Sequence, residues 1–393
     1  MPLDGARYNT SRKWQALCLL LFFSLPFAAC RRTNPPDPGY HEYAYVSNGK
    51  SDSVSVIDVL SLRNVKTIAV GRNPSGVAAN SKKNEIYVAN AESNNVSVID
   101  SERNEVVSTI GVNRSPYFVS VSADGKRAYV ANSGSANVSV IDLESRKVIA
   151  TIRVGNAPGL ARVSPDGNLV VVSNRSDDTV SVIDTAKLAV RSTLPVCHQP
   201  QDVAILPDSS KAFAACPGSN QVASLDLKTD RVLTLLEVGQ TPIQMALKPD
   251  GGELFVSNFD SNNFSIVETY PNEVAGSYLI GSHPVRGVVT SDNSLLYVSN
   301  FGSDNISVYS IDEGRVVGSV HVGNRPDALT LTPNEEQLLV VDSGSGDVAV
   351  VRMVKTRANS KISADRVLVN VIPVGSQPND ILIKAFEVKA SGR

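Results

Sequence analysis

The 393-residue sequence lacks amphipathic helices of ordinary length, long apolar runs and runs of basic residues. Between Tyr43 and Glu387 no segment shows the 3.6-residue periodicity of such a helix, which argues against helical fold classes. The apolar run from Trp14 to Phe27 is too short to span a bilayer comfortably. The formal net charge is only −2, so the chain offers poor counterion release to a phosphate backbone. We therefore expect no nucleic-acid partner.

Recognised catalytic motifs are also missing from the sequence. It has no G-x-S-x-G elbow, no H-E-x-x-H, no cysteine pair at zinc spacing, no P-loop and no C-x-x-C-H haem attachment motif. His198, Asp202 and Arg286 are the one set that can be drawn as an acid/base cluster. We therefore expect no metal and no cofactor, and we keep enzymatic activity only as an alternative.

The N-terminal segment has the three parts of a secretory signal peptide. Basic Arg7, Arg12 and Lys13 precede the apolar run, and small residues follow it. The end of the run, Phe-Ala-Ala-Cys at 27–30, resembles a bacterial lipobox, although Phe27 stands where the pattern prefers leucine. The resemblance implies cleavage before Cys30 and attachment of a diacylglyceryl group to its thiol. The alternative is an ordinary signal peptide with an incidental cysteine.

These features divide the chain and predict its location. Residues 1–29 are the expected signal peptide, and residues 30–41 are a Pro-rich tether that holds a domain off a membrane. Cleavage removes three positive charges and one negative charge, so the formal charge changes from −2 to −4. We expect an exported, membrane-anchored protein facing the periplasm or the cell exterior.

Two cysteines remain after cleavage and lipidation, Cys197 and Cys216. They lie at the ends of two segments that are expected to pair as a hairpin, which brings them close together. Disulfides persist in exported proteins. The sequence leaves two alternatives, a bridge between Cys197 and Cys216 or two buried free thiols.

The rest of the chain is a repeat with a period of 42 residues, and such a period marks a propeller, a solenoid or an array. One marker ends a short strand and recurs at Asn48, Asn90, Asn132, Asn174, Cys216, Asn258, Asn300 and Asp342. A second marker, a proline after a polar loop, recurs at Pro74, Pro116, Pro158, Pro200, Pro242, Pro284, Pro326 and Pro378. The last interval is 52 residues, and the extra ten fall in the irregular, basic segment from Met353 to Val367.

Each unit alternates apolar and polar residues with a period of two, in four short strands joined by turn residues. A four-stranded antiparallel sheet cannot bury both faces alone, and radial stacking buries them against its neighbours. The sequence therefore predicts an all-β, closed propeller over residues 42–389, followed by a short tail at 390–393. Eight units are counted, and the last strand is expected to close the ring by pairing with the first.

The segments Tyr45-Val46-Ser47-Asn48, Tyr87-Val88-Ala89-Asn90 and Tyr129-Val130-Ala131-Asn132 resemble the YVTN family of β-propeller repeats. In this chain each is followed by a V-S-V-I-D-like strand and, in most units, by a V-G-x-x-P-like loop. The resemblance implies the propeller fold, but seven blades are more usual in that family. Seven blades, with one unit packed irregularly, are therefore the alternative to eight.

We expect most of the repeated polar residues to have structural roles. The asparagine that ends the second strand and the aspartate that ends the third are expected to bond backbone groups in the following turns. Function is expected where the units differ, on loops and at the channel mouth. The residues two and four positions after each proline are expected to face the channel, because side chains alternate along a strand.

These considerations select ten candidate ligand-binding residues in the channel and on one rim, which are Arg72, Arg114, Arg162, His198, Asp202, Gln244, His283, Arg286, Arg325 and Asp380. One interpretation is a site for an anionic or polar ligand, with arginines as donors and Asp202 and Asp380 orienting them. The other is a water-filled channel in which Asp202 and Arg286 compensate each other.

The preferred functional hypothesis is a monomeric binding or scaffold module for a protein, a peptide or a cell-envelope polymer. It rests on the signal, the tether, the rigid fold and the missing catalytic motifs. The alternative is a lactonase-like or hydrolase-like enzyme that acts on a small anionic substrate at the channel mouth.

Overall fold

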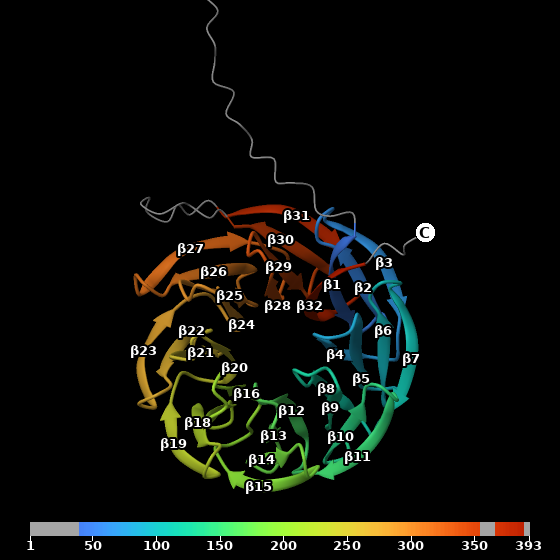
Figure 1. The fold of residues 1–393 in the computed structure, drawn as a ribbon. Coiled ribbons are helices and arrows are strands. Elements are labelled where there is room, and N and C mark those ends of the chain that lie inside the picture. Colours follow the sequence, from blue (N-terminus) through green and yellow to red (C-terminus); the bar gives the residue numbers. More distant parts are fainter. Residues whose placement is uncertain (1–38, 354–365, 389–393) are drawn as a thin grey trace, which may run out of the picture. The chain divides into compact units, whose positions relative to one another are not determined.

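The computed structural model describes residues 39–353 and 366–388, which form eight four-stranded antiparallel sheets arranged in a ring (Figure 1). The eight-blade prediction is confirmed, and the seven-blade alternative is wrong. The expected signal peptide with Cys30, nearly all of the tether, residues 354–365 of the irregular segment and the end of the chain lie outside the described residues.

In seven blades the first two strands, counted outward from the channel, form the hairpin that follows the repeated proline, and in the remaining blade they come from opposite ends of the propeller. The innermost strands are β4 (Pro74–Ala79), β8 (Pro116–Val121), β12 (Pro158–Val163), β16 (Asp202–Ile205), β20 (Pro242–Leu247), β24 (Pro284–Val289), β28 (Pro326–Leu331) and β32 (Pro378–Glu387). The second strands are β5 (Glu85–Asn90), β9 (Arg127–Asn132), β13 (Leu169–Asn174), β17 (Lys211–Cys216), β21 (Glu253–Asn258), β25 (Leu295–Asn300), β29 (Gln337–Asp342) and β1 (Tyr40–Asn48).

The two outer strands complete each blade. The third strands are β6 (Asn95–Asp100), β10 (Asn137–Asp142), β14 (Thr179–Asp184), β18 (Gln221–Asp226), β22 (Asn263–Glu268), β26 (Asn305–Ser310), β30 (Asp347–Arg352) and β2 (Ser53–Asp58). The outermost strands are β7 (Glu105–Gly111), β11 (Lys147–Arg153), β15 (Ala189–Pro195), β19 (Arg231–Glu237), β23 (Glu273–Leu279), β27 (Arg315–His321), β31 (Val367–Pro373) and β3 (Arg63–Ala69).

The ring closes where its first and last strands pair. In blade 1 the strand order is β3-β2-β1-β32, and the antiparallel pairing of β1 with β32 runs from Tyr40 opposite Glu387 to Asn48 opposite Pro378. Blades 2 to 8 follow in chain order, from β4–β7 to β28–β31. Closure by strands from both ends, as predicted, removes an unpaired edge inside the ring. β1 starts at Tyr40, so two residues assigned to the tether belong to the propeller.

The core lies between neighbouring blades, where the middle strands of each sheet are buried on both faces. The tyrosine of the repeated motif shows how one blade engages the next. Tyr45 is fully buried, and its hydroxyl donates to Asn104 Oδ1 of blade 2 at 2.6 Å. A buried tyrosine is favourable where its hydroxyl finds a partner. This residue therefore contributes both apolar area and a specific bond between blades.

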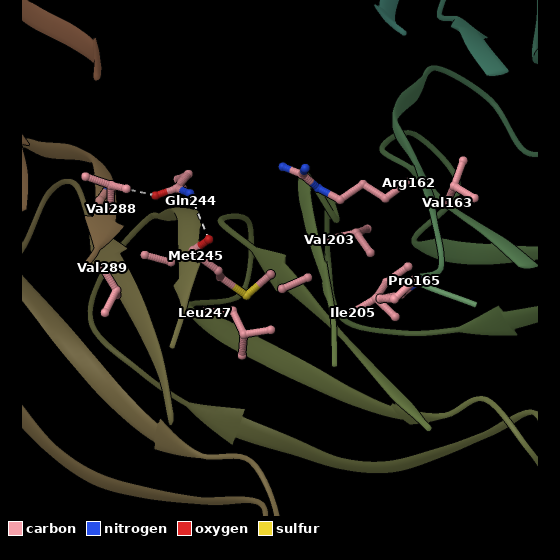
Figure 2. A pocket seen from close by; sticks show the side chains of 13 residues that line it. Arg162, Val163, Pro165, Val203, Ile205, Gln244, Met245, Leu247, Val288 and Val289 are labelled. Carbon is pink, nitrogen blue, oxygen red and sulfur yellow. Dashed lines mark hydrogen bonds between the residues drawn. The ribbon is translucent and has the colours of Figure 1, made fainter. Parts of the chain in front are cut away.

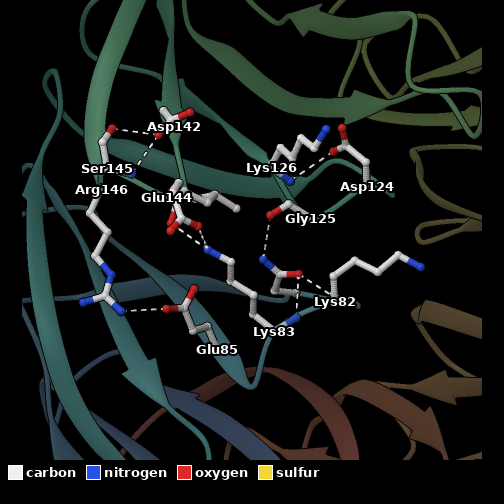
Figure 3. A network of polar contacts seen from close by, with 12 residues as sticks. Lys82, Lys83, Glu85, Asp124, Gly125, Lys126, Asp142, Glu144, Ser145 and Arg146 are labelled. Atoms are coloured by element: carbon white, nitrogen blue, oxygen red, sulfur yellow. Dashed lines mark hydrogen bonds and ion pairs between the residues drawn. The ribbon is translucent and has the colours of Figure 1, made fainter.

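Ion pairs on the channel end opposite the repeated prolines also join neighbouring blades (Figure 3). Lys83 of blade 2 binds Glu144 of blade 3 at 2.6 Å, and Arg146 of blade 3 binds Glu85 of blade 2 at 2.7 Å. Because these groups are partly or largely exposed, each contributes little to stability. They fix the orientation of turns that are held mainly by the apolar core.

The repeated asparagine has a structural role, but its predicted partners are wrong. In blade 3, Asn132 Nδ2 donates to two side chains, Asn137 Oδ1 at 2.8 Å and Ser139 Oγ at 2.8 Å. The same contacts to residues five and seven positions later occur at Asn48, Asn90, Asn174, Asn258 and Asn300. The amide therefore joins the second strand to the third, and in blade 1 the oxygen of Asn48 also accepts the backbone N–H of Gly375, in the loop before the repeated proline, at 3.1 Å.

The repeated aspartate behaves as predicted. At the end of β6, Asp100 Oδ1 accepts the backbone N–H groups of Glu102 and Arg103 at 2.9 and 3.1 Å. Corresponding backbone contacts occur at Asp58, Asp142, Asp184 and Asp226. This carboxylate fixes the turn that leads to the outermost strand of the blade.

Blade 8 departs from this pattern because two carboxyl groups replace the amide and its partner. Asp342 stands where six blades have asparagine, Asp347 lies five residues later, and Ala349 replaces the serine. Asp342 is fully buried, and one oxygen of each aspartate has no hydrogen-bond partner in the described structure. Burial, the charge of Asp347 and a hydrogen bond to it raise the pKa of Asp342 to about 8. Burial and the neighbouring Asp347 therefore favour the protonated form of Asp342.

We expect Asp342→Asn to stabilise the protein at neutral and alkaline pH. The folded pKa lies above the ordinary aspartate value, so the folded state keeps a proton that the unfolded chain releases. Stability is then greatest below the ordinary pKa and falls as pH rises through about 8. Asparagine removes this decline, and a gain of roughly 1–3 kcal/mol at pH 9 is expected from the usual cost of an unsatisfied buried group.

Urea unfolding at pH 5, 7 and 9 measures this effect. Asp184→Asn is the matched control, because the Asp184 carboxylate accepts turn N–H groups that lower its pKa. In Asp184→Asn the free energy of unfolding should still decline toward alkaline pH. An unchanged pH profile in Asp342→Asn would show that the pKa of Asp342 is not raised in the folded protein.

Candidate functional site

The loops that precede the repeated prolines form one rim of the channel, and hydrogen bonds from neighbouring turns fix them. In blade 3, the backbone N–H of Arg114 donates to Ser135 Oγ at 2.9 Å and that of Ser115 donates to Asn94 Oδ1 at 2.9 Å. The residue before each proline has a positive φ, as at His283 and Arg325. The rim is thus a repeated, rigid scaffold from which only the side chains vary.

A bulge directly after the proline changes which side chains face the channel. In most blades the register between the two inner strands shifts at this point, as it does between Pro326 and Leu329 in blade 8. A bulge re-aims a side chain that regular alternation would turn away. Residues one position after the proline therefore line the channel together with those at position two.

The upper part of the channel, next to this rim, is a cavity of ≈ 470 Å³ that we call the upper cavity. It brings together five of the ten predicted residues, Arg162, Asp202, Gln244, Arg286 and Asp380. Its other polar lining includes Asn73, Gln201 and Asn379, and its apolar lining includes Phe118, Leu160, Ile243 and Val285. Strands of most blades contribute, so the site exists only when the ring is closed.

Arg162 lies between two neighbouring blades. Its Nη2 is 3.3 Å from Asp202 Oδ1 of blade 5, and its guanidinium lies 5.4 Å from the ring centre of Phe118 in blade 3. The side chain of Arg162 is 39% exposed to the channel, whereas that of Asp202 is only 4% exposed. The ring of Phe118 and the carboxylate of Asp202 thus hold the guanidinium at the cavity wall.

Arg286 is held on the other side of the cavity by two carboxyl groups. Its Nη1 donates to Asp380 Oδ1 at 2.9 Å, and its Nε is 4.0 Å from Asp327 Oδ1. Burial lowers the pKa of Arg286, but the charges of Asp380 and Asp327 outweigh burial and raise it. The predicted pairing of Asp202 with Arg286 is wrong, because each has a nearer partner of opposite charge.

Three polar side chains of the cavity also bind the backbone of the next blade. Asp202 Oδ2 accepts the N–H of Met245 at 2.8 Å, and Asp380 Oδ2 accepts the N–H of Val77 at 3.1 Å. Gln244 Oε1 accepts the N–H of Gly287 at 2.9 Å. These contacts link blades 5 to 6, 1 to 2 and 6 to 7. The orienting role predicted for Asp202 and Asp380 is therefore combined with a structural one.

Asp327 is a cavity residue that the sequence interpretation missed. It lies one position after Pro326, where alternation placed a side chain away from the channel. Its side chain is 29% exposed, and no residue in the described structure donates a hydrogen bond to its carboxylate. Burial raises the pKa of Asp327, Arg286 lowers it, and Asp380 raises it further. The register shift after Pro326 is a property of the paired strands, so alternation along one strand could not identify this residue.

The lower part of the channel is a second cavity of ≈ 390 Å³ with a different character (Figure 2). Arg162 and Gln244 line both cavities and lie between them. Below them the lining is apolar and includes Ile205, Met245, Leu247 and Val289. The charged side chains that line these two cavities are therefore Arg162, at their boundary, and the arginines and aspartates of the upper one.

The other five predicted residues do not line the upper cavity. Arg325 lines a separate cavity of ≈ 310 Å³ on the rim, and its guanidinium lies 5.6 Å from the ring centre of Phe301. His283 packs against Phe259 with ring centres 4.5 Å apart. His198 Nδ1 is 2.7 Å from Asp178, and Arg72 Nη2 donates to Glu92 O at 3.3 Å. Arg114 is exposed on the rim.

The described residues show neither a metal cluster nor a membrane span. No three His, Cys, Asp or Glu side chains among them gather closely enough to hold a metal ion. The described part of the chain also contains no helix long and apolar enough to cross a membrane. In the upper cavity itself the titratable groups are arginines, aspartates and Tyr117, and the pair of His198 with Asp178 lies apart from it.

Blade 5 contains a disulfide between Cys197 and Cys216. The sulfurs are 2.06 Å apart and the Cα atoms 5.7 Å apart. Both cysteines are buried among the apolar residues shared by blades 4 and 5. Cys216 occupies the position of the repeated asparagine, so blade 5 lacks the amide contacts to the third strand and has instead a covalent bond from the second strand to the loop before the innermost strand.

Two family models match separate parts of the sequence. Residues 39–163 match the model described as a YNCE-like beta-propeller, and residues 282–370 match the model described as a lactonase, 7-bladed beta-propeller. No curated protein matches the sequence. The two matches support a β-propeller family for this chain, and the chain has eight blades where the second model's description gives seven.

Solved structures show the same fold at low sequence identity. The dihydro-heme d1 dehydrogenase NirN in complex with DHE matches with a TM-score of 0.68 and 14% identity, over 86% of this chain and 74% of that one. The hydrazine synthase of Kuenenia stuttgartiensis matches with a TM-score of 0.57 and 22% identity, over 79% and 92%. A protein of unknown function from Desulfotomaculum acetoxidans has a TM-score of 0.55 and 16% identity, over 84% and 99%. These likenesses concern the propeller fold alone.

Proposed function

We propose that this protein is an exported, membrane-anchored β-propeller that acts as a binding module for a protein, a peptide or a cell-envelope polymer. In this proposal the rim and the upper cavity form the recognition face. The lipid on Cys30 and the Pro-rich tether hold that face away from the membrane. The protein acts as a monomer and has no nucleic-acid partner.

The disulfide supports export. Disulfides persist in oxidising compartments and are rare where thiols are kept reduced. The Cys197–Cys216 bond joins residues 19 positions apart, and such a bond contributes about 3 kcal/mol in the chain-entropy model. The disulfide of blade 5 is therefore consistent with a signal peptide that delivers the chain to an oxidising compartment.

The upper cavity is the observation that carries the binding role. Polar side chains from several blades meet in this cavity, and they differ from blade to blade. The backbone that carries them is repeated from unit to unit. A cavity with a few convergent polar groups is the usual form of a ligand site. Its polar groups are arginines, aspartates, amides and the hydroxyls of Ser75 and Tyr117, without a histidine or a thiol, which favours recognition over catalysis.

Lipid attachment is tested at Cys30. We expect the full chain to incorporate labelled palmitate when it is expressed in a bacterium, and we expect Cys30→Ser to lose the label and leave the membrane fraction. Cys18→Ser is the matched control, because residue 18 lies in the expected signal peptide and should not affect labelling. Persistent labelling of Cys30→Ser would contradict the lipoprotein proposal.

Recognition by the rim is tested with photo-crosslinking residues in whole cells. We expect a crosslinker at Ser115, which is exposed on the rim, to give defined adducts. The same group at Lys82, which is exposed on the opposite end of the ring, should give none. Adducts of equal yield from both positions, or from neither, would contradict a recognition face at the rim.

A lactonase-like enzyme is the second candidate, favoured by the family-model match over residues 282–370. This segment contains Arg286, Arg325 and Asp327. If the protein hydrolyses a lactone in the upper cavity, Arg286→Gln should reduce the hydrolysis rate by about 100-fold, the usual cost of losing one electrostatic donor. Lys82→Gln is the control on the opposite face. Equal rates in the two variants would remove this candidate.

A further inference from the structure

The charge of the upper cavity identifies the chemistry of its ligand, and this inference rests on the binding function proposed above. The cavity is lined by two guanidiniums, Arg162 and Arg286, and by three carboxyl groups, Asp202, Asp327 and Asp380. No other side chain that lines it carries a charge. With all five groups ionised, one negative charge is not compensated. The cavity therefore favours a cation over an anion.

The uncompensated charge can be assigned to one residue. Asp202 accepts the N–H of Val203 at 2.9 Å and that of Met245 at 2.8 Å, and Asp380 accepts the N–H of Val77 and a guanidinium N–H. Asp327 has only the Nε of Arg286 at 4.0 Å, which is beyond hydrogen-bond distance. Asp327 is thus the carboxylate of the cavity that accepts no hydrogen bond in the described molecule.

Neither guanidinium is well placed to attract an anion. Arg286 lies between Asp380 and Asp327, so an incoming carboxylate would meet two negative charges beside one positive charge. Arg162 is paired with Asp202 and faces the ring of Phe118. The two arginines are therefore occupied within the wall, which leaves a carboxylate as the group available to a ligand.

We propose that the upper cavity binds a primary ammonium group on the carboxylate of Asp327. An ammonium has three N–H donors, and a partly desolvated carboxylate that lacks donors is its complementary acceptor. Asp327 lines both the upper cavity and the rim cavity, so a ligand can reach it from the rim.

The rest of the upper cavity fits the body of such a ligand. Leu160, Ile243 and Val285 line it beside the polar groups, and they offer apolar contact to a short methylene chain. A small amine and a lysine side chain of a peptide share this chemistry, a methylene chain that ends in an ammonium group. The experiment distinguishes these two sources.

Isothermal titration of the full chain with pentylammonium tests the proposal. We expect measurable binding, and weaker or no binding of pentanoate, which has the same chain length and the opposite charge. Asp327→Asn should weaken pentylammonium binding by about tenfold or more, because a charge-assisted contact becomes a neutral one. Asp260→Asn is the matched control, because Asp260 is exposed and does not line the upper cavity.

The pH dependence separates a direct contact from a structural effect of the variant. Pentylammonium stays charged in acid, whereas Asp327 becomes protonated, so binding by the unmodified protein should weaken as pH falls. The charges that act on the pKa of Asp327 are those of Arg286 and Asp380, and Arg325 lines the rim cavity together with Asp327. In Asp327→Asn this decline should be absent. Unchanged unfolding temperatures of the two variants confirm that the fold is intact.

Two peptides identify the source of the ammonium group. Acetyl-Gly-Lys-Gly-amide should bind in the same Asp327-dependent way if the ligand is a peptide, with acetyl-Gly-Gln-Gly-amide as its control. Binding of pentylammonium alone indicates a small amine. Tighter binding of pentanoate, or equal binding by Asp327→Asn, would overturn the proposal. If adducts from Ser115 persist when no amine binds, the binding function stands and only this ligand class is wrong.

Discussion

The packing of one blade against the next is the constraint on which the whole structure depends. A single four-stranded sheet with two apolar faces cannot bury either face from water by itself. The middle strands of all eight blades are buried, so each blade requires a neighbour on each side. The pairing of β1 with β32 supplies the last neighbour. A closed ring leaves no blade with an uncovered face, and it also fixes the geometry of the channel.

Because the same contacts recur in each blade, a departure from the repeat is informative. Cys216 and Asp342 both replace the asparagine that joins the second strand to the third. In blade 5 a disulfide instead links this end of the second strand to Cys197 in the loop before the innermost strand. In blade 8 Asp342 and Asp347 stand where other blades have the amide and its partner, and burial beside Asp347 raises the pKa of Asp342. The same position thus carries a covalent link in one blade and a buried acid in another.

The sequence was sufficient for the fold because period, strand pattern and turn residues are local signals. The 42-residue interval predicts the number of blades, and the position of the first and last strands predicts how the ring closes. The partners of Asn132 were not predictable in this way, since an amide bonds side chains as readily as turn backbone. Asp327 was missed for another reason. A bulge is a property of the paired backbone, and alternation within one strand does not reveal it.

The charge of the upper cavity follows from the structural demands on its wall. Asp202, Asp380 and Gln244 accept backbone N–H groups of the next blade, so these positions need acceptors whatever the ligand is. Carboxylates at two of them bring negative charge into a narrow channel, and Arg162 and Arg286 compensate it. The guanidiniums that appear to be anion receptors in the sequence are therefore part of the wall. The carboxylate of Asp327 accepts no backbone N–H group and contacts the scaffold only through the 4.0 Å ion pair with Arg286, so it is the charged residue of the cavity to which we assign recognition of the proposed ligand.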